Sequence, residues 1–393
     1  MLRSDVTVAT LADSDLAVDR TLADIATSFR FLFDVTPVDL VEARAAFRAN
    51  GRSPKFEYRP LSDDPAVTTA RLEEVPIGDV KEPTVAHLLQ AKQRELLLLV
   101  QMLSCRDSPE FLALSIEQYG AVSPALLHEA EGILDAVPTP PPDPGPWLDA
   151  DAFVQLAQAE LDRYRAFAPD IESHVEIRAG STGVMVSNGD LLVAPTARVS
   201  SARAEALLHH EVGTHVVTFV NGSHQPLRIL ASGVAGHEET QEGLAVLAEY
   251  LVGGLTAGRL RQLAARVVAV HEMLGGAEFP EVHRGLVDAG VSADQAFTIT
   301  MRVFRSGGLT KDAVYLRGVH DLVHHLRTGG SLDALWLGKM PLAAVPLVED
   351  LHARGLLADP LLRPRYLDDP AATARLSRLH EVDSLSSLIG EST

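Results

Sequence analysis

Apolar residues recur at helical spacing along most of the chain. Between residues 239 and 251, Leu244, Leu247, Ala248 and Leu251 fall at i, i+3, i+4 and i+7, which predicts an amphipathic helix. The same spacing predicts a helix over residues 151–167, and the strong helix formers of residues 85–103 predict another. Helices are therefore expected to dominate the fold.

The period changes between residues 175 and 193. Three short runs there have the composition of β-strands, namely residues 175–177, 184–186 and 191–193. Asn188-Gly189 separates the last two runs, and this dipeptide predicts a β-hairpin. A helix is expected to follow from about residue 202 to residue 220, with Asn221-Gly222 ending it. The predicted fold class is α+β, with a small sheet and its hairpin placed directly before a helix.

A dense run of prolines divides the chain at residues 138–146. Neither a helix nor a central strand tolerates such a run, so the segment is predicted to be a semi-rigid linker. We expect a mainly helical N-terminal region over residues 1–147 that ends in this linker. Residues 148–393 are expected to form a second domain, which holds the sheet and has a helical C-terminal part.

Composition narrows the classes of partner. The chain has 34 Lys and Arg against 53 Asp and Glu, which gives a net charge of −19. This balance disfavours binding to nucleic acid or to anionic membranes, because both need clustered positive charge. A single cysteine, Cys105, excludes an internal disulfide, and charged residues interrupt any signal-peptide core near the N-terminus. We expect a cytoplasmic protein with neither nucleic acid nor membrane as a partner.

The candidate chemistry lies in the helix predicted over residues 202–220. Its segment His209-His210-Glu211-Val212-Gly213-Thr214-His215 is flanked by apolar residues, which indicates that the helix is buried. Unpaired titratable groups are costly to bury, and a metal ion satisfies them well. The order His-Glu-x-x-x-His is one residue longer than the His-Glu-x-x-His helix of zinc peptidases. This spacing makes His210 and His215 candidate metal ligands.

The extra residue predicts a local distortion of the helix. At about 100° per residue, His210 and His215 would point about 140° apart on a regular α-helix. A π-bulge adds one residue to a turn and brings both imidazoles to one side. Gly213 lies inside that turn and is expected to ease the distortion.

A third ligand is expected on the next predicted helix. Glu242 follows His215 by 27 residues, and a helix-borne glutamate at such a distance completes the site in one large class of zinc peptidases. Glu238 and Glu239 remain alternatives. His209 is interpreted as a supporting or core histidine rather than a ligand.

The paired motifs carry a family resemblance. His210-Glu211-Val212-Gly213-Thr214-His215 followed by Gln241-Glu242-Gly243-Leu244-Ala245 resembles the QEGLA-motif family named as flavohaemoglobin expression modulators. That family is similar to the metallopeptidases that remove the C-terminal tyrosine of tubulin. The resemblance extends over roughly residues 34–367 and includes the segment from Gly307 to Gly318. It implies a zincin-like fold and Zn²⁺ held by His210, His215 and Glu242, with Glu211 as general base.

The expected function is hydrolysis of a peptide bond by a zinc-dependent metallopeptidase, in particular a carboxypeptidase acting on a peptide or protein C-terminus. Tyr315 is a candidate donor to the developing oxyanion. Lys311 and Arg317, with Arg302 as an alternative, are candidates for binding the substrate carboxylate. The competing hypothesis is a non-catalytic regulatory or scaffold protein with a structural metal site, which would need a fourth protein ligand.

Overall fold

α-Helices make up most of the chain, as the apolar spacing predicts. The computed structural model describes residues 10–141, 143, 145–179 and 183–389. The N-terminal helices are α1 (Asp13–Ser28), α2 (Phe31–Asp34), α3 (Leu40–Asn50), α4 (Pro65–Glu73), α5 (Pro83–Ser104), α6 (Pro109–Tyr119) and α7 (Pro124–Ala136). The middle of the chain holds α8 (Ala150–Arg165), α9 (Ala204–His210), α10 (Val217–His224), α11 (Ile229–Ser232) and α12 (His237–Leu251). The later helices are α13 (Ala257–Leu274), α14 (Phe279–Asp288), α15 (Ala293–Phe304), α16 (Val314–Arg327), α17 (Val345–Ala353) and α18 (Pro370–Arg378).

Proline marks where several of these helices begin. Its fixed φ suits the first helical turn, and its missing N–H is one that a helix start leaves unbonded in any case. Ser123 caps α7 as well, because its hydroxyl accepts a hydrogen bond from the Leu126 N–H at 3.2 Å. The helices that open on proline are α4, α5, α6, α7 and α18.

Two small sheets accompany the helices. β3 (Val184–Ser187) and β4 (Asp190–Val193) form the predicted antiparallel hairpin, and both Asn188 and Gly189 have positive φ in its turn. β2 (Val175–Ile177) pairs with β4 in parallel, so the strand order is β2-β4-β3. β1 (Trp147–Leu148) and β5 (Val199–Ser200) form a separate two-stranded ribbon.

The helix after the hairpin continues past its predicted end. Asn221-Gly222 lies inside α10, which ends at His224, so the predicted stop at this dipeptide is wrong. Gly222 serves close packing instead, since a Cβ there would lie 2.3 Å from the Leu230 carbonyl oxygen. Asn221 is buried and exchanges two hydrogen bonds with the backbone of Leu362.

Helices α12 and α16 meet backbone to backbone. A Cβ on Gly243 would lie 2.4 Å from the carbonyl carbon of Gly318, and a Cβ on Gly318 would lie 2.0 Å from the Glu239 carbonyl oxygen. Only glycine at both positions allows this approach. Tyr315 stands one turn before Gly318, on the face of α16 that packs against α12.

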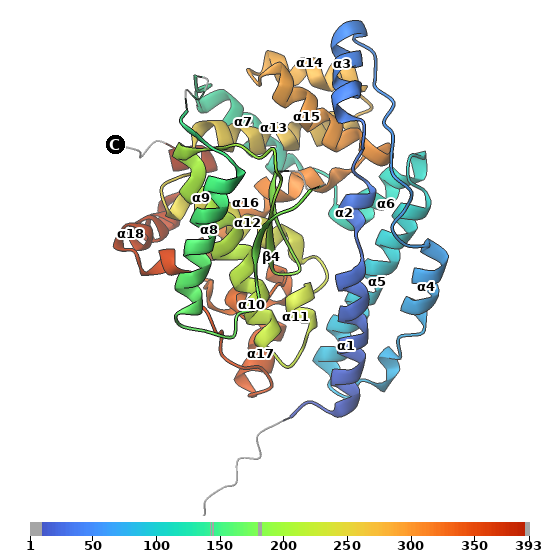
Figure 1. The fold of residues 1–393 in the computed structure, drawn as a ribbon, viewed down its shortest axis with the longest axis vertical. Coiled ribbons are helices and arrows are strands. Elements are labelled where there is room, and N and C mark those ends of the chain that lie inside the picture. Colours follow the sequence, from blue (N-terminus) through green and yellow to red (C-terminus); the bar gives the residue numbers. More distant parts are fainter. Residues whose placement is uncertain (1–9, 142, 144, 180–182, 390–393) are drawn as a thin grey trace, which may run out of the picture.

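The N-terminal helices and the site-bearing helices share one hydrophobic core. Leu22, Leu89 and Ile133 belong to the same buried cluster as Leu247 and Leu263. Figure 1 shows α1, α4, α5 and α6 along one side of the molecule, with α8, α9, α10 and α12 on the other. The proline-rich segment joins α7 to β1, and its Pro142 and Pro144 lie outside the described residues. The division at residue 147 stays a prediction.

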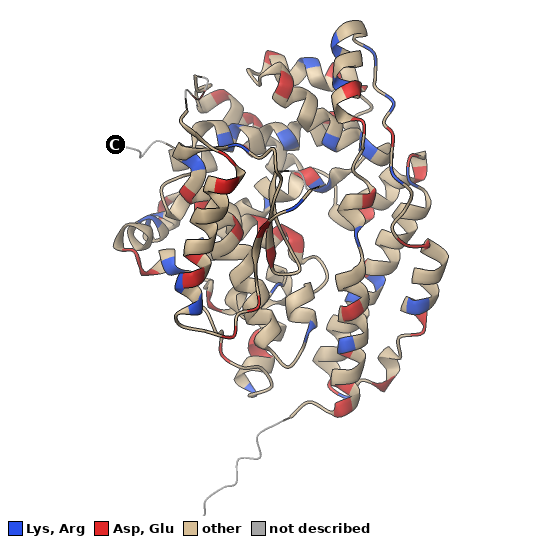
Figure 2. Cartoon of the chain, viewed as in Figure 1, with Lys and Arg blue, Asp and Glu red and all other residues tan. Residues whose placement is uncertain are grey.

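Charged residues of both signs are interspersed over the helices of both halves (Figure 2). Within the described part of the chain, no helix is both long and apolar enough to span a membrane.

Candidate metal centre

The site helix contains the predicted π-turn. α9 ends at His210, a π-helix covers Glu211–Val216, and α10 continues to His224. The wide turn brings the rings of His210 and His215 to a centroid separation of 5.2 Å. The prediction of a π-bulge from the five-residue spacing is therefore confirmed.

Gly213 has a different role in this turn from the one expected. Its φ lies outside the left-handed region, so the backbone conformation there does not require glycine. The space there is tight, since a Cβ on Gly213 would lie 3.0 Å from the His209 ring and 3.3 Å from the Tyr366 ring. Gly213 thus makes room for the aromatic contact between His209 and Tyr366.

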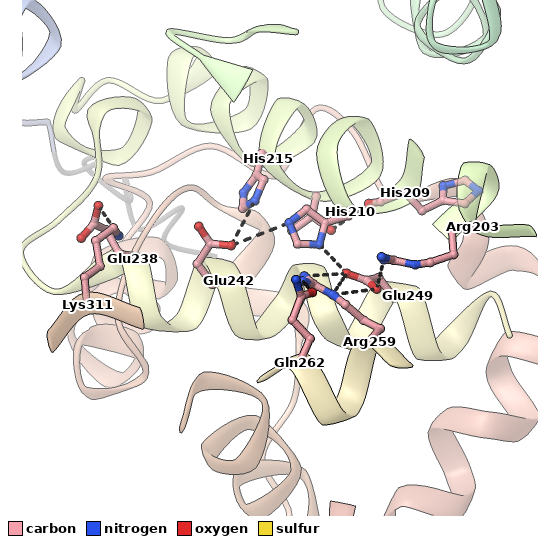
Figure 3. Close-up of polar contacts among 11 residues, drawn as sticks. Arg203, His209, His210, His215, Glu238, Glu242, Glu249, Arg259, Gln262 and Lys311 are labelled. Atoms are coloured by element: carbon pink, nitrogen blue, oxygen red, sulfur yellow. Dashed lines mark hydrogen bonds and ion pairs between the residues drawn. The ribbon is translucent and has the colours of Figure 1, made fainter. Parts of the chain in front are cut away.

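His210, His215 and Glu242 converge on one point. The Glu242 carboxylate lies 3.7 Å from His210 Nε2 and 3.9 Å from His215 Nε2. One donor atom from each residue lies within 4.8 Å of the others, and within the described chain no other His, Cys, Asp or Glu joins this group. Figure 3 shows both imidazoles pointing at Glu242 from the helix above α12, while His209 points away. The choice of Glu242 over Glu238 and Glu239 follows from this convergence.

The electrostatic surroundings of the two histidines differ. Burial, with the charges of His210 and Lys339, lowers the pKa of His215 to about 4 despite the opposing Glu242. At neutral pH His215 is the neutral imidazole that metal ions bind. Burial also opposes the charged form of His210, but the hydrogen bond to Glu249 and the charges of Glu211, Glu249 and Glu242 raise its pKa overall.

Glu249 fixes the orientation of His210. Its carboxylate is fully buried and lies 2.9 Å from His210 Nδ1, on the ring edge opposite the Nε2 that faces Glu242. Arg203 donates to Glu249 at 2.7 Å and Arg259 Nε donates at 3.2 Å. Burial raises the pKa of this carboxyl, but Arg259, His210 and Arg203 outweigh it and hold the pKa well below its usual range. A charged carboxylate behind a ligating histidine sets its tautomer and raises its basicity.

Glu211 is placed beside the three convergent residues without being one of them. The side chain is buried, and burial raises the pKa of its carboxyl to about 7, with His210 lowering and Glu242 raising it further. A carboxyl with a pKa near neutrality is suited to take and return protons.

The predicted substrate-facing residues lie on or just before α16. Lys311 is buried and pairs with Glu238 at 2.9 Å, and the charge of Glu242 also acts on it. Burial, and then Glu242, raise the pKa of Tyr315, which keeps its phenol protonated. Arg317 pairs with Glu239 and donates to the carbonyls of Tyr119 and Ala121.

Sequence reasoning does not find Glu249, Arg203 or Arg259. Glu249 lies seven residues after Glu242, on the same face of the helix. This spacing alone could have indicated that Glu249 lies near the histidines. The two arginines come from separate elements that only the tertiary fold brings together.

The site has two histidines on a π-distorted helix and a glutamate on the helix packed against it. A buried glutamate directly follows the first histidine. This arrangement defines a zincin-like metallopeptidase. A family model described as microtubule-associated tyrosine carboxypeptidase matches residues 45–384. The chain belongs to this family, and the predicted enzyme class, a metallopeptidase acting as a carboxypeptidase, is confirmed.

No curated protein sequence matches the chain. Among solved structures, the putative lipoprotein from Colwellia psychrerythraea is similar, with a TM-score of 0.41 and 12% identity over 96% of this chain and 78% of that one.

Proposed function

We propose that the protein is a zinc-dependent carboxypeptidase that removes a residue from the C-terminus of a peptide or protein. The observation that carries the proposal is the convergence of two imidazole nitrogens and one carboxylate oxygen within 4.8 Å. This donor set is typical of catalytic zinc, and three protein ligands leave one tetrahedral position for water or substrate. Ligands of a tetrahedral zinc are about 3.3 Å apart, so the three side chains need to move by less than 1 Å or so to bind it.

When bound, zinc supplies Lewis acidity toward the scissile carbonyl and lowers the pKa of water at the site. Glu211 accepts the proton of the attacking water and passes it to the leaving amine. Its buried carboxyl suits both steps, since the pKa is raised to about 7.

Tyr315 and Lys311 are proposed to act on the substrate. The protonated Tyr315 phenol supplies a hydrogen bond to the oxyanion that develops at the attacked carbonyl. Lys311 supplies a positive charge near the leaving residue, although Glu238 already compensates part of it. Arg317 stays a prediction as a carboxylate ligand, because its guanidinium is bound to Glu239 and two carbonyls.

The scaffold alternative needs a fourth protein ligand. Within the described residues the metal-binding group has three members, which favours a catalytic site over a structural one.

Metal content and peptide cleavage test the proposal together. The purified protein is expected to bind one equivalent of zinc and to release tyrosine from a peptide that ends in tyrosine. His215→Ala is expected to lose most of the zinc, whereas His271→Ala, which changes an exposed histidine on α13, retains it. Glu211→Gln is expected to keep zinc and fold but to lose roughly 10²–10⁴-fold in activity.

Two results would contradict the proposal. Unchanged zinc content in His215→Ala would remove the ligand assignment. A Glu211→Gln variant with full activity, measured by tyrosine release over time, would remove the general base.

A further inference from the structure

Behind Tyr315 lies a cluster of three arginines around one aspartate, which we call the arginine cluster. Arg266 comes from α13, Arg302 from α15, Arg305 from the turn after α15 and Asp312 from the turn before α16. Arg266, Arg305 and Asp312 are buried, with exposed fractions of 8%, 5% and 1%. Three guanidinium groups and one carboxylate leave a local charge of +2.

Asp312 compensates only one of these arginines fully. Arg302 donates to both carboxylate oxygens of Asp312, at 2.6 Å and 2.7 Å. Arg266 Nε lies 3.8 Å from the same carboxylate, which is too far for a hydrogen bond. In the described part of the chain, Arg305 has no carboxylate within 4.0 Å and donates instead to the Thr36 hydroxyl at 3.1 Å.

Buried guanidinium N–H groups in this cluster lack acceptors. Arg266 Nε and Nη1 and Arg305 Nε have no hydrogen-bond partner. Burial, followed by the charge of Arg302, lowers the pKa of both Arg266 and Arg305 to about 10. Unpaired buried donors on charged groups cost free energy, so an anion that accepts from them would be bound favourably.

The cluster is connected to the metal centre through Tyr315. The Arg266 guanidinium lies over the Tyr315 ring at 4.7 Å. The charges of Glu242 and Arg302 both act on the Tyr315 hydroxyl, so this group is near the candidate metal ligand as well as the cluster. The Arg302 side chain is 25% exposed and Tyr315 is half-buried, whereas the unpaired donor atoms of Arg266 and Arg305 are buried. Solvent therefore reaches the cluster at Arg302.

Two other cations beside the metal centre are already paired. Glu238 compensates Lys311, and Glu239 compensates Arg317. Each of these pairs has no net charge, whereas the arginine cluster has an excess of two positive charges. A third cation, Lys339, has no ion pair in the described part of the chain, but it carries a single charge, and burial lowers its pKa to about 8. An incoming carboxylate therefore gains most at the arginine cluster.

We propose that the arginine cluster binds the free α-carboxylate of the substrate's C-terminal residue, with Arg266 and Arg302 as the donors. This assignment rests on the proposed carboxypeptidase function. It gives the enzyme a physical reason to act at chain ends, because an internal peptide bond carries no carboxylate to neutralise the cluster. Tyr315 then stands between the bound carboxylate and the scissile bond.

Binding to an inactive variant separates this proposal from catalysis. The zinc-loaded Glu211→Gln protein is titrated with a fluorescently labelled peptide ending in tyrosine, either as the free acid or as the C-terminal amide. The free acid is expected to bind at least 50-fold more tightly. Adding Arg266→Lys, which keeps the charge but removes the planar donor pair, is expected to reduce that preference to below 5-fold.

Arg261→Lys is the matched control. Arg261 lies on the same helix, is also buried, and donates to the carbonyls of Leu134, Val137 and Ala289. This variant is expected to keep the free-acid preference even where it loses thermal stability. Arg266→Met is expected to lose the preference without a lower Tm, because it relieves repulsion within the cluster.

The possible outcomes are distinct. A free-acid preference that survives in both Arg266 variants overturns the carboxylate assignment while leaving the proposed function intact. A wild-type enzyme that cleaves the amide as fast as the acid also overturns it. Absence of cleavage of either peptide by the zinc-loaded wild type contradicts the proposed function itself.

Discussion

Glu249 shows how a residue outside the motifs controls one of their histidines. The carboxylate is fully buried, yet Arg203, Arg259 and His210 surround it and keep it ionised. Because it accepts from Nδ1, the His210 lone pair on Nε2 is left for the metal. The same contact resists rotation of the ring.

Replacing this carboxylate tests its role. Glu249→Gln is expected to lower zinc affinity by about 10–100-fold, because a neutral amide neither raises His210 basicity nor compensates the two arginines. Competition with a calibrated chelator measures the affinity. Glu205→Gln, on the exposed face of α9, is the control and is expected to bind zinc as the wild type does. Equal affinities in all three proteins would show that Glu249 has only a structural role.

For single residues, the sequence predicts those whose role follows from the spacing of a motif. His210, His215 and Glu242 follow from two short motifs and the geometry of a helix turn. Arg266 belongs to no motif, and its relation to Tyr315 depends on how α13 packs against the turn before α16. An arginine in an amphipathic helix is ordinarily solvated, so its burial could not be predicted.

Among the elements, the contact between α12 and α16 places the metal ligand relative to Tyr315. Glu242 is next to Gly243, and Tyr315 is three residues before Gly318. The two glycines let the helix axes approach, which brings Tyr315, which we propose acts on the substrate, toward the metal centre.

Adding a single methyl group at this contact is expected to separate the helices. Gly243→Ala places a Cβ 2.4 Å from backbone atoms of Gly318, so the free energy of unfolding is expected to fall by about 1–3 kcal/mol or more. Gly285→Ala on α14 is the control, since a Cβ there meets nothing within 4 Å. It is expected to stabilise by about 0.5–1 kcal/mol through helix propensity. Urea denaturation measures both, and two stabilised variants would contradict the close contact.

Elements with strong local signals were predicted well. The hairpin follows from Asn188-Gly189, and the helices from apolar spacing. The end of α10 was predicted too early, because Asn221-Gly222 has the composition of a helix stop. In the fold, the Asn221 side chain bonds to the Leu362 backbone, and the absence of a Cβ on Gly222 lets the Leu230 backbone approach. Local composition does not show whether such a dipeptide ends a helix or makes a tertiary contact within it.

Across the whole molecule, Asp19 joins the N-terminal helices to the site-bearing part. This side chain on α1 accepts the Arg228 N–H at 2.6 Å and the Ile229 N–H at 3.0 Å, at the start of α11. Burial raises the pKa of the carboxyl to about 6, although both backbone hydrogen bonds lower it. The contact therefore depends on pH.

The sign of this dependence is opposite to that of a salt-bridged carboxylate. A pKa raised from 3.8 to about 6 in the folded state makes folding most favourable when Asp19 is protonated. Its contribution to the free energy of unfolding is expected to fall by about 2 kcal/mol as the pH rises from 4 to 6, out of about 3 kcal/mol over the whole titration. Asp19→Asn removes this change, so the variant is expected to gain stability relative to the wild type over that range.

Urea denaturation at pH 4, 5, 6 and 7 measures the difference. Asp24→Asn, on the exposed side of α1, is the matched control and is expected to track the wild type. A constant difference between Asp19→Asn and the wild type across this range would show that the pKa of Asp19 is not raised.

Composition indicates a boundary at the proline-rich segment, but it does not show whether the two flanking regions are separate domains. Helix α7 ends at Ala136, before these prolines, and β1 begins at Trp147 after them, but apolar residues on both sides belong to one core. A sequence shows where a chain cannot be regular, and not whether the flanking parts pack together.

The π-turn in the site helix also sets how this protein tolerates changes in chain length. An insertion in a regular helix rotates everything after it by about 100°. A π-turn absorbs one extra residue locally, so α10 keeps the phase that brings Asn221 to Leu362 and Gln225 to Ala358. Loss of one residue within Glu211–Val216 would therefore leave the contacts of α10 in register. Loss of one residue from α12 between Glu242 and Glu249 would instead rotate one of the two carboxylates by about 100° relative to the other, so that both could no longer face His210.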